Sequence, residues 1–574
     1  MNGRHLKWAV VAAAAAAILV IGTGASARQE EGAAMDHSQL PMLEGPFETA
    51  PEVTAVCLTC HAEVGTEILG TTHWTWEFEN EVLGETVGKR NVINNYCVSV
   101  APNEPRCTSC HIGYGWTDDS FDFSAAGNID CLVCHDTTGT YEKFPTAAGH
   151  PVYGETRLFG GREWPAPDLA AVARSVGEPT RAACGSCHFT GGGGDAVKHG
   201  DLDTSLTSPS FELDVHMDAD GLDFTCQTCH FTSGHDISGG RYVMDAATGG
   251  PAACDTCHSD SPHGIEAIDG HTEYVACQTC HIPAYARAQP TKMTWDWTTA
   301  GVATEEGTHP NIITDPDTGL VVYDSRKGDF TWEGDVVPEY RWSNGVFDFA
   351  LLEDGVDPAI GFQVNQPLGE RGDGKIWPFK LFTGTQPYDA SANLIAPLNL
   401  FPKDDEDGAT AFWRNWDLEL AVEGGFAAWG VDFSGEMGYI DSEMWWPITH
   451  MVAPAEQSLQ CTDCHDPQGR LDFAALGYDD GEVQALTAFP PGEPGEPATT
   501  TTTTADTTTS TVADTTTTTA PEPTTTTVPA TTTTVVAAPE PAEQSVSLLP
   551  ILGILAIVIG GSAAAYVLIR RSYT

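Results

Sequence analysis

The sequence predicts a mainly α-helical fold with extensive irregular structure, and three observations lead to this expectation. The pentapeptide pattern C-x-x-C-H occurs eight times. The chain contains 58 glycines and 37 prolines, which favour short helices joined by irregular connections. Apolar residues at helical spacing, among them Phe412, Trp416 and Phe426, predict a packed helix within 409–429. The fold is therefore expected to be organised around the repeated pentapeptide.

Each copy of the pentapeptide places a histidine directly after its second cysteine, and the eight copies leave only Cys97 of the 17 cysteines unused. Two thiols at this spacing attach a porphyrin covalently, and the adjacent imidazole ligates its iron. A zinc site or a disulfide framework would not require a histidine after every cysteine pair. We therefore expect eight covalently bound haem c groups. The attachment residues, numbered here as motifs 1 to 8, are Cys57, Cys60 and His61; Cys107, Cys110 and His111; Cys131, Cys134 and His135; Cys184, Cys187 and His188; Cys226, Cys229 and His230; Cys254, Cys257 and His258; Cys277, Cys280 and His281; and Cys461, Cys464 and His465.

We expect one octahaem cytochrome c domain over residues 52–489, with the haems forming much of its core. There is roughly one haem for every fifty residues, a high ratio for a domain of ordinary size. Between motifs 7 and 8, residues 282–460 carry no motif and are rich in tryptophan, phenylalanine, aspartate and glycine. Within them, 320–323 and 329–332 are typical of short strands or loops.

The N-terminal residues 1–27 predict a secretory signal peptide. A charged start containing Arg4 and Lys7 precedes an apolar run and a small-residue cleavage site. An uncleaved membrane anchor is the alternative, and either segment directs the haem domain out of the cytoplasm. The polar residues 28–51 that follow predict a flexible arm.

The composition changes abruptly at the C-terminal end. Residues 490–545 are rich in threonine and proline and have little to bury, so we expect a disordered stalk. Residues 548–569 form an apolar run long enough to cross a bilayer as a transmembrane helix. Two arginines begin the tail 570–574 and favour the cytoplasmic side. The haem domain is therefore expected on the extracytoplasmic side of the cytoplasmic membrane, anchored by this helix.

The charge balance is strongly acidic, with 26 Lys and Arg against 80 Asp and Glu and a formal net charge of −54. Such a field repels nucleic acid and anionic headgroups, so we expect no nucleic-acid partner. An anionic substrate would need a local positive pocket.

Each haem iron requires a decision about its second axial ligand. Two imidazoles close an iron and suit it to electron transfer, whereas a catalytic iron leaves or exchanges one position. Among the histidines outside the motifs, we expect His37 and His309 to be surface residues and leave His199 open. The expected second ligands are His73, His150, His216, His235, His263, His271 and His450.

Four longer strings surround the motifs and carry a family resemblance. They are GKRNVINNYC at 88–97, EPRCTSCHIGYGW at 104–116, DCLVCHDTTGT at 130–140, and residues 191–201. Over about residues 50–480 the chain resembles the octahaem tetrathionate reductase family of c-type cytochromes. Hydroxylamine oxidoreductase-like octahaem proteins would also fit the number of haems, but the strings favour the first family.

The resemblance implies a catalytic haem at motif 2 whose iron has a lysine in place of the second histidine. Lys198 fits this position better than Lys89 or Lys143. The resemblance also implies an aspartate, an asparagine and a cysteine beside this haem. The corresponding residues are Asp195, Asn94 and Cys97.

The chemistry of these residues is coherent by itself. A neutral amine is a more labile ligand than imidazole, and burial beside ferric iron lowers the pKa of a lysine. Lys198, Arg106 and Lys89 would attract an anion, and a Cys97 thiolate would attack an S–S bond. The plainer alternatives are a surface lysine and a buried, unreactive cysteine.

These observations favour an extracytoplasmic oxidoreductase that reduces a small sulfur or nitrogen compound. Tetrathionate, cleaved to thiosulfate, is the substrate that the resemblance implies, and nitrite and hydroxylamine are the other candidates. The electron donor is expected to be a membrane or extracytoplasmic electron-transfer protein. The alternatives are a non-catalytic electron conduit with eight closed irons and a haem-rich scaffold that docks redox partners.

Overall fold

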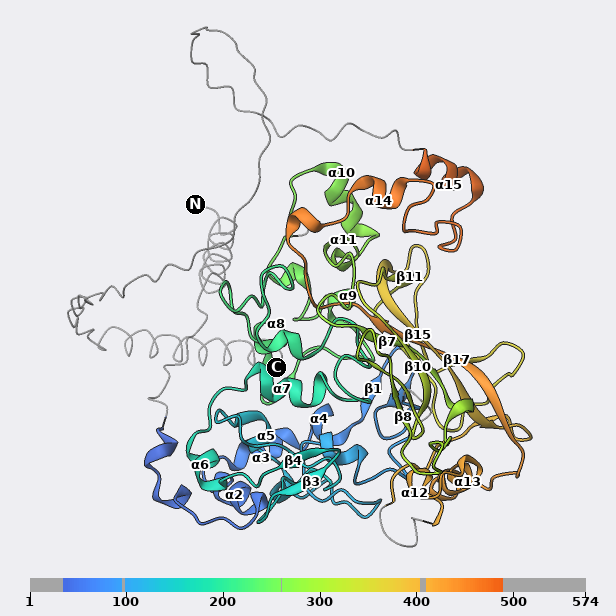
Figure 1. Ribbon diagram of the computed structural model, residues 1–574. Coiled ribbons are helices and arrows are strands. Elements are labelled where there is room, and N and C mark those ends of the chain that lie inside the picture. Colours follow the sequence, from blue (N-terminus) through green and yellow to red (C-terminus); the bar gives the residue numbers. More distant parts are fainter. Residues whose placement is uncertain (1–34, 95–98, 260, 403–408, 489–574) are drawn as a thin grey trace, which may run out of the picture. The chain divides into compact units, whose positions relative to one another are not determined.

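The computed structural model describes residues 35–94, 99–259, 261–402 and 409–488 (Figure 1). The predicted signal peptide, stalk and transmembrane helix lie outside these residues, as does Cys97. Within the described residues, no helix is both long and apolar enough to cross a membrane.

Short helices dominate the segments that carry the motifs. Most motifs lie on a short helix of their own. A helical turn brings the two cysteines, three residues apart, to the same face, as attachment of one porphyrin requires. The α-helices are α2 (Ala50–Cys57), α3 (Ala62–Ile68), α4 (Thr72–Thr75), α5 (Leu132–His135), α6 (Leu169–Arg174), α7 (Arg181–His188), α8 (Cys226–Cys229), α9 (Asp245–Thr248), α10 (Glu266–Asp269), α11 (Cys277–His281), α14 (Cys461–His465) and α15 (Asp480–Thr487). The 3-10 helices of the described residues are η1 (His37–Gln39), η2 (Pro41–Leu43), η3 (Cys107–Cys110), η4 (Ala126–Asn128), η5 (Thr204–Thr207), η6 (Cys254–Thr256), η7 (Gly270–Glu273), η8 (Trp297–Thr299) and η10 (Ala455–Gln457).

The second half of the segment 28–51, for which we expected a flexible arm, contains short helices. Residues 37–43 form η1 and η2, and α2 begins at Ala50. Leu43 and Ala50 are buried with Val53 in a cluster that also holds Leu132 of α5. This apolar packing fixes a segment that looked merely polar in sequence.

Residues 291–447 build a nine-stranded sheet, so the expectation of a mainly α fold is wrong for this segment. The strand order is β13-β17-β15-β7-β10-β9-β8, and β11 and β16 also pair with β15. Long β15 and β17 lie antiparallel, with Phe379 opposite Pro447 and Asp389 opposite Met437; Figure 1 shows them side by side. The strands are β7 (Thr291–Asp296), β8 (Ile312–Thr314), β9 (Val321–Asp324), β10 (Gly328–Glu333), β11 (Glu339–Ser343), β13 (Phe362–Gln363), β15 (Lys375–Asp389), β16 (Leu394–Ile395) and β17 (Met437–Pro447).

Small two-stranded sheets complete the fold. They are β1 (Phe78–Asn80) with β2 (Glu85–Val87), β3 (Arg157–Phe159) with β4 (Arg162–Trp164), β5 (Thr232–Ser233) with β6 (Asp236–Ile237), and β12 (Phe347–Phe349) with β14 (Asn365–Pro367).

The local predictions in this segment fare better than the overall class. Strands β9 and β10 confirm the strand-like character of 320–323 and 329–332. The helix expected within 409–429 forms as two, α12 (Phe412–Asn415) and α13 (Leu418–Trp429). The break occurs because Trp416 is left-handed, with φ 59°, and Asp417 then caps α13 by accepting hydrogen bonds from the first-turn amides.

The largest apolar cluster belongs to the sheet. It contains buried aromatic residues of β7, β15 and β17, including Trp295, Trp377, Phe379 and Trp446, and Phe426 of α13 packs with them. Motif 2 is tied to this region by Asn103, whose side chain bonds the backbone of Leu398 at 2.7 Å and of Leu400 at 2.9 Å. The sheet is thus a platform next to the loop that precedes motif 2.

Candidate functional site

Six motif histidines face a second histidine ring at nearly constant distance. The centroid separations lie between 6.0 and 6.3 Å. A metal–imidazole nitrogen bond is about 2 Å long, so two imidazoles on opposite sides of one iron have centroids about 6 Å apart. The residues present therefore fit a haem iron in each pair. The pairs are His61 with His37, His188 with His73, His258 with His216, His230 with His450, His281 with His263, and His465 with His271.

His37 is the residue that sequence reasoning missed. We expected a surface histidine, but η1 places its ring 6.2 Å from that of His61, stacked at 22°. His309, the other expected surface histidine, stacks on Trp416 with centroids 4.0 Å apart. His150 contacts Tyr114 and Tyr153, and His235 contacts Glu67. Neither forms a ring pair with a motif histidine within the described residues.

Carboxylates and carbonyls orient several of these imidazoles. Asp201 accepts hydrogen bonds from the backbone amide of His450, at 2.9 Å, and from its ring, at 3.2 Å. Asp269 lies 3.0 Å from Nδ1 of His263. Such contacts at Nδ1 leave Nε2 for a metal. Burial lowers the pKa of His188 to about 3 and favours the neutral, ligating form.

Thiols of different motifs interact with one another, which orders the motifs in space. Hydrogen-bonded thiol pairs join motif 1 to motif 3, motif 2 to motif 4, motif 4 to motif 5, and motif 6 to motif 7. Electrostatic effects between thiols link motifs 3 and 4, 5 and 6, and 7 and 8. The order is therefore 1-3-4-5-6-7-8, with motif 2 beside motif 4.

Motif 2 differs from the six paired motifs. The His111 ring is fully buried among aromatic rings, with centroid distances of 5.0 Å to Trp74, 5.3 Å to Trp76 and 5.0 Å to Trp116. Its Nε2 lies 2.6 Å from the carbonyl oxygen of Trp74. In the part of the chain that the structure describes, no second histidine faces His111.

Lys198 lies on a loop whose backbone is hydrogen-bonded by side chains of the sheet. Buried Lys380 of β15 donates hydrogen bonds to the carbonyl oxygens of Val197 and Lys198, both at 3.1 Å. The Thr291 hydroxyl of β7 lies 2.6 Å from the Ala196 carbonyl and 3.1 Å from that of His199. Lys380 also donates to this hydroxyl at 2.6 Å. Four consecutive carbonyls, 196–199, are thus fixed by two side chains.

The surroundings of Lys198 favour a neutral amine. Burial lowers its pKa well below the usual range, and the positive charges of Arg241 and Lys89 lower it further, while the Cys110 thiol opposes them. The Lys198 side-chain nitrogen lies 4.6 Å from the ring centroid of Trp446. Lys198 is therefore an electrostatic neighbour of motif 2.

Comparisons with known proteins agree with this geometry. Residues 292–468 match the family model described as "Cytochrome c bacterial". The chain is similar to an octaheme cytochrome c from Shewanella oneidensis of known crystal structure, with 43% identity and a TM-score of 0.69, over 78% of this chain and 97% of that one. The chain belongs to the octahaem c-type cytochromes. An uncharacterized protein from Archaeoglobus fulgidus is 25% identical over 271 residues, which are 40% of this chain and 89% of that protein.

The cofactors of this octahaem cytochrome are covalently bound haem c groups, in agreement with its eight attachment motifs.

Two other lysines that the sequence offered near motif 2 have different contacts. Lys143 forms a buried ion pair with Asp130 at 3.1 Å and donates to the His111 carbonyl. Lys89 lies over the Trp76 ring, 4.6 Å from its centroid. Lys143 is thus committed to a structural network.

The expected neighbours of Lys198 have structural contacts of their own. Asp195 accepts hydrogen bonds from the amide and hydroxyl of Thr204 and from Gln289 at 3.0 Å, so its carboxylate closes the Lys198 loop. The Asn94 amide lies 3.5 Å from the Lys89 carbonyl oxygen. Arg106 donates to the Pro145 carbonyl at 3.0 Å.

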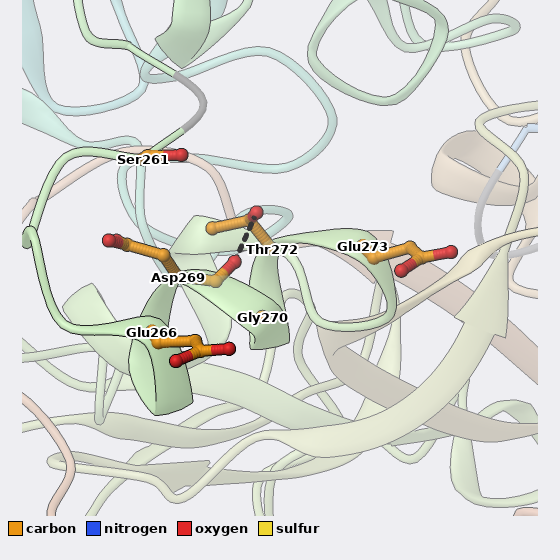
Figure 2. A pocket seen from close by; sticks show the side chains of 6 residues that line it. All are labelled: Ser261, Glu266, Asp269, Gly270, Thr272 and Glu273. Carbon is orange, nitrogen blue, oxygen red and sulfur yellow. Dashed lines mark hydrogen bonds between the residues drawn. The ribbon is translucent and has the colours of Figure 1, made fainter.

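An acidic hollow lies near motifs 7 and 8. It has a volume of about 430 Å³, and Figure 2 shows the carboxylates of Glu266, Asp269 and Glu273 around it. Thr272 Oγ1 donates to the Asp269 carbonyl at 2.7 Å. This concentration of negative charge is unsuited to an anionic substrate.

Proposed function

We propose that this octahaem cytochrome is an extracytoplasmic oxidoreductase that reduces a small sulfur or nitrogen compound at motif 2, where Lys198 is the second axial ligand. One observation carries the proposal. Neither His111 nor His135 of motif 3 has a facing histidine among the described residues, but motif 2 has Lys198 as an electrostatic neighbour, since the Cys110 thiol acts on this partly buried amine of lowered pKa. A haem bound here supplies one-electron transfer at an iron that a small molecule can approach.

The other motifs supply the electrons. We propose His37, His73, His216, His263, His271 and His450 as second ligands, because their rings match the spacing of two imidazoles on one iron. His150 and His235 remain the candidates for motif 3. Closed irons of this kind pass electrons without binding substrate.

Tetrathionate is the first substrate to test. Two electrons break its central S–S bond and release two thiosulfate ions, with no proton required. Hydroxylamine would instead take two electrons and two protons to give ammonia and water, and nitrite is a third candidate. The positive charges of Lys89 and Arg106, which both act on Cys107 of motif 2, favour an anion locally although the protein as a whole is acidic.

The donor is proposed to be a membrane or extracytoplasmic electron-transfer protein. The resemblance of 548–569 to a membrane span and of 1–27 to a signal peptide supports an exported, membrane-anchored location.

Low-temperature electron paramagnetic resonance of the haem-loaded protein tests the assignment, with Lys198→Ala beside Lys89→Ala as the matched control. We expect one signal distinct from the bis-histidine set, altered in the first variant and retained in the second. Identical spectra for wild type and Lys198→Ala would reject Lys198 as a ligand.

A non-catalytic electron conduit is the second candidate, because the continuous order of touching motifs suits long-range transfer. Reduced protein mixed with tetrathionate, nitrite or hydroxylamine separates the two. Reoxidation by one of them supports the enzyme, and no reoxidation by any of the three favours the conduit.

A further inference from the structure

Arg241 is a partly buried cation with two fully buried donor nitrogens. Its Nε and Nη2 atoms are inaccessible to water and have no hydrogen-bond partner. No carboxylate of the described ranges forms an ion pair with it. Unpaired charged donors in a protein interior are strongly unfavourable, so such a group ordinarily binds a partner.

Aromatic rings hold the Arg241 guanidinium in place. Its central carbon lies 4.8 Å from the ring centroid of Phe349, 4.9 Å from that of Trp446 and 5.5 Å from that of Tyr242. The ring faces attract the positive charge weakly. They do not accept hydrogen bonds from the N–H groups, which point outward in the plane of the guanidinium. The rings therefore orient the guanidinium and leave its hydrogen-bonding capacity unused.

Arg241 belongs to the same electrostatic neighbourhood as Lys198. Lys198 lies 4.6 Å from the same Trp446 ring that Arg241 faces. Two basic side chains thus contact the same tryptophan ring in a protein of net charge −54.

We propose that Arg241 is the oxyanion anchor of the Lys198 site. The planar guanidinium matches a carboxylate or another oxyanion through paired N–H donors. Two sources have this chemistry, namely the propionate of a haem in this region and a soluble inorganic oxyanion. The proposal rests on the proposed function, which it deepens by naming the charge and the geometry of the group bound beside Lys198.

Sulfate is the probe for the soluble source because it is an oxyanion that ligates haem iron poorly. Haem-loaded protein is titrated with sulfate against chloride at equal ionic strength, and haem absorption and electron paramagnetic resonance are followed. The variants are Arg241→Gln, which removes the charge, and Arg241→Lys, which keeps the charge and loses the fork. The control is Arg341→Gln, because exposed Arg341 also stacks on a tryptophan, 3.9 Å from the Trp445 centroid.

A soluble oxyanion is supported if sulfate shifts a haem signal to saturation in wild type and control. The apparent affinity should then fall about tenfold or more in Arg241→Gln, the loss expected for a charge-assisted hydrogen bond. Arg241→Lys should lie between them.

A propionate is supported if sulfate has no effect but one haem has a lower reduction potential in Arg241→Gln, restored in part by Arg241→Lys. Loss of a nearby positive charge disfavours the added electron.

The proposal is overturned if wild type shows no sulfate response and Arg241→Gln leaves every haem potential unchanged. If Arg241→Gln fails to incorporate haem, the same measurements on Arg241→Lys decide, because this variant keeps the charge. The proposed function fails separately, when Lys198→Ala leaves the resonance spectrum unchanged while the Arg241 effects persist.

Discussion

The motif-bearing segments and the sheet segment 291–447 are stabilised in different ways. In the first, short helices carry the haem-attachment cysteines and histidines, and the apolar clusters are small. In the second, the protein's own aromatic side chains fill the largest cluster of the molecule. In the motif-bearing segments the haems are expected to supply much of the stabilising core. The sheet has a core of its own and positions Lys380 and Thr291 to hydrogen-bond the Lys198 loop.

Removal of the haems should have the largest effect and should separate the two regions. Protein produced without haem attachment is expected to lose amide protection around motifs 1 to 7, because the groups that fill the space between facing histidines are missing. Strands β7, β15 and β17 should keep more protection. Hydrogen exchange followed by mass spectrometry of apo and haem-loaded protein measures this, and equal loss in both regions would contradict it.

A cavity in the sheet core should destabilise the sheet segment and leave the haem environment unchanged. Phe379→Ala removes a fully buried ring of β15 and is expected to lower the free energy of unfolding by about 3–5 kcal/mol. The haem absorption spectrum of the folded protein should stay unchanged. Ile360→Ala is the control, since Ile360 is 81% exposed. Denaturant unfolding followed by tryptophan fluorescence measures the free energy of unfolding of both variants. A similar loss for Ile360→Ala would show that the effect does not come from the sheet core.

Lys380 joins the two regions, and its replacement sharpens the comparison. Lys380→Met keeps the apolar stem but removes the donors to the Val197 and Lys198 carbonyls, with an expected cost of about 1–3 kcal/mol. The same variant should broaden or shift the resonance assigned to Lys198, and Lys380→Arg should restore it in part. A loss of stability with an unchanged resonance would make Lys380 a purely structural residue.

The smallest effect concerns pH and lies within the sheet. Burial, together with the charge of Lys327, lowers the pKa of Lys292 to about 6. The unfolded chain then binds more protons than the folded one between this pKa and the ordinary lysine value. The stability contribution of Lys292 should therefore rise with pH between about 6 and the ordinary lysine pKa, with a slope of up to about 1.4 kcal/mol per pH unit, and should be constant below about 6. Lys292→Met should flatten this slope in urea unfolding at pH 7 and pH 9, while Lys375→Met should leave it unchanged.

The haem-attachment residues could be predicted from the sequence because five adjacent residues contain the whole chemical requirement. The pairing of rings could not, because it depends on segments far apart in the chain, as His230 with His450 illustrates. His37 was misjudged since its polar surroundings conceal the packing of Leu43. Lys198 was found through resemblance, whereas Lys380, Thr291 and Arg241 act through tertiary contacts that no local pattern announces.

The sheet was missed for a related reason. Single strands such as β9 and β10 have local signals, but β15 pairs with β17 about fifty positions away, and β7 joins it in parallel. Proline and glycine within β15 further weaken its strand pattern.

The order of touching motifs has a consequence for how charge is stored. Motif 2 is a branch beside motif 4, and the remaining motifs extend from motif 4 in two directions, toward motif 1 and toward motif 8. Two motifs lie on one arm and four on the other, so electrons can reach motif 2 from both sides. In the reaction proposed above, two electrons would then be present before the substrate binds, and the reaction would not require a second encounter with the donor.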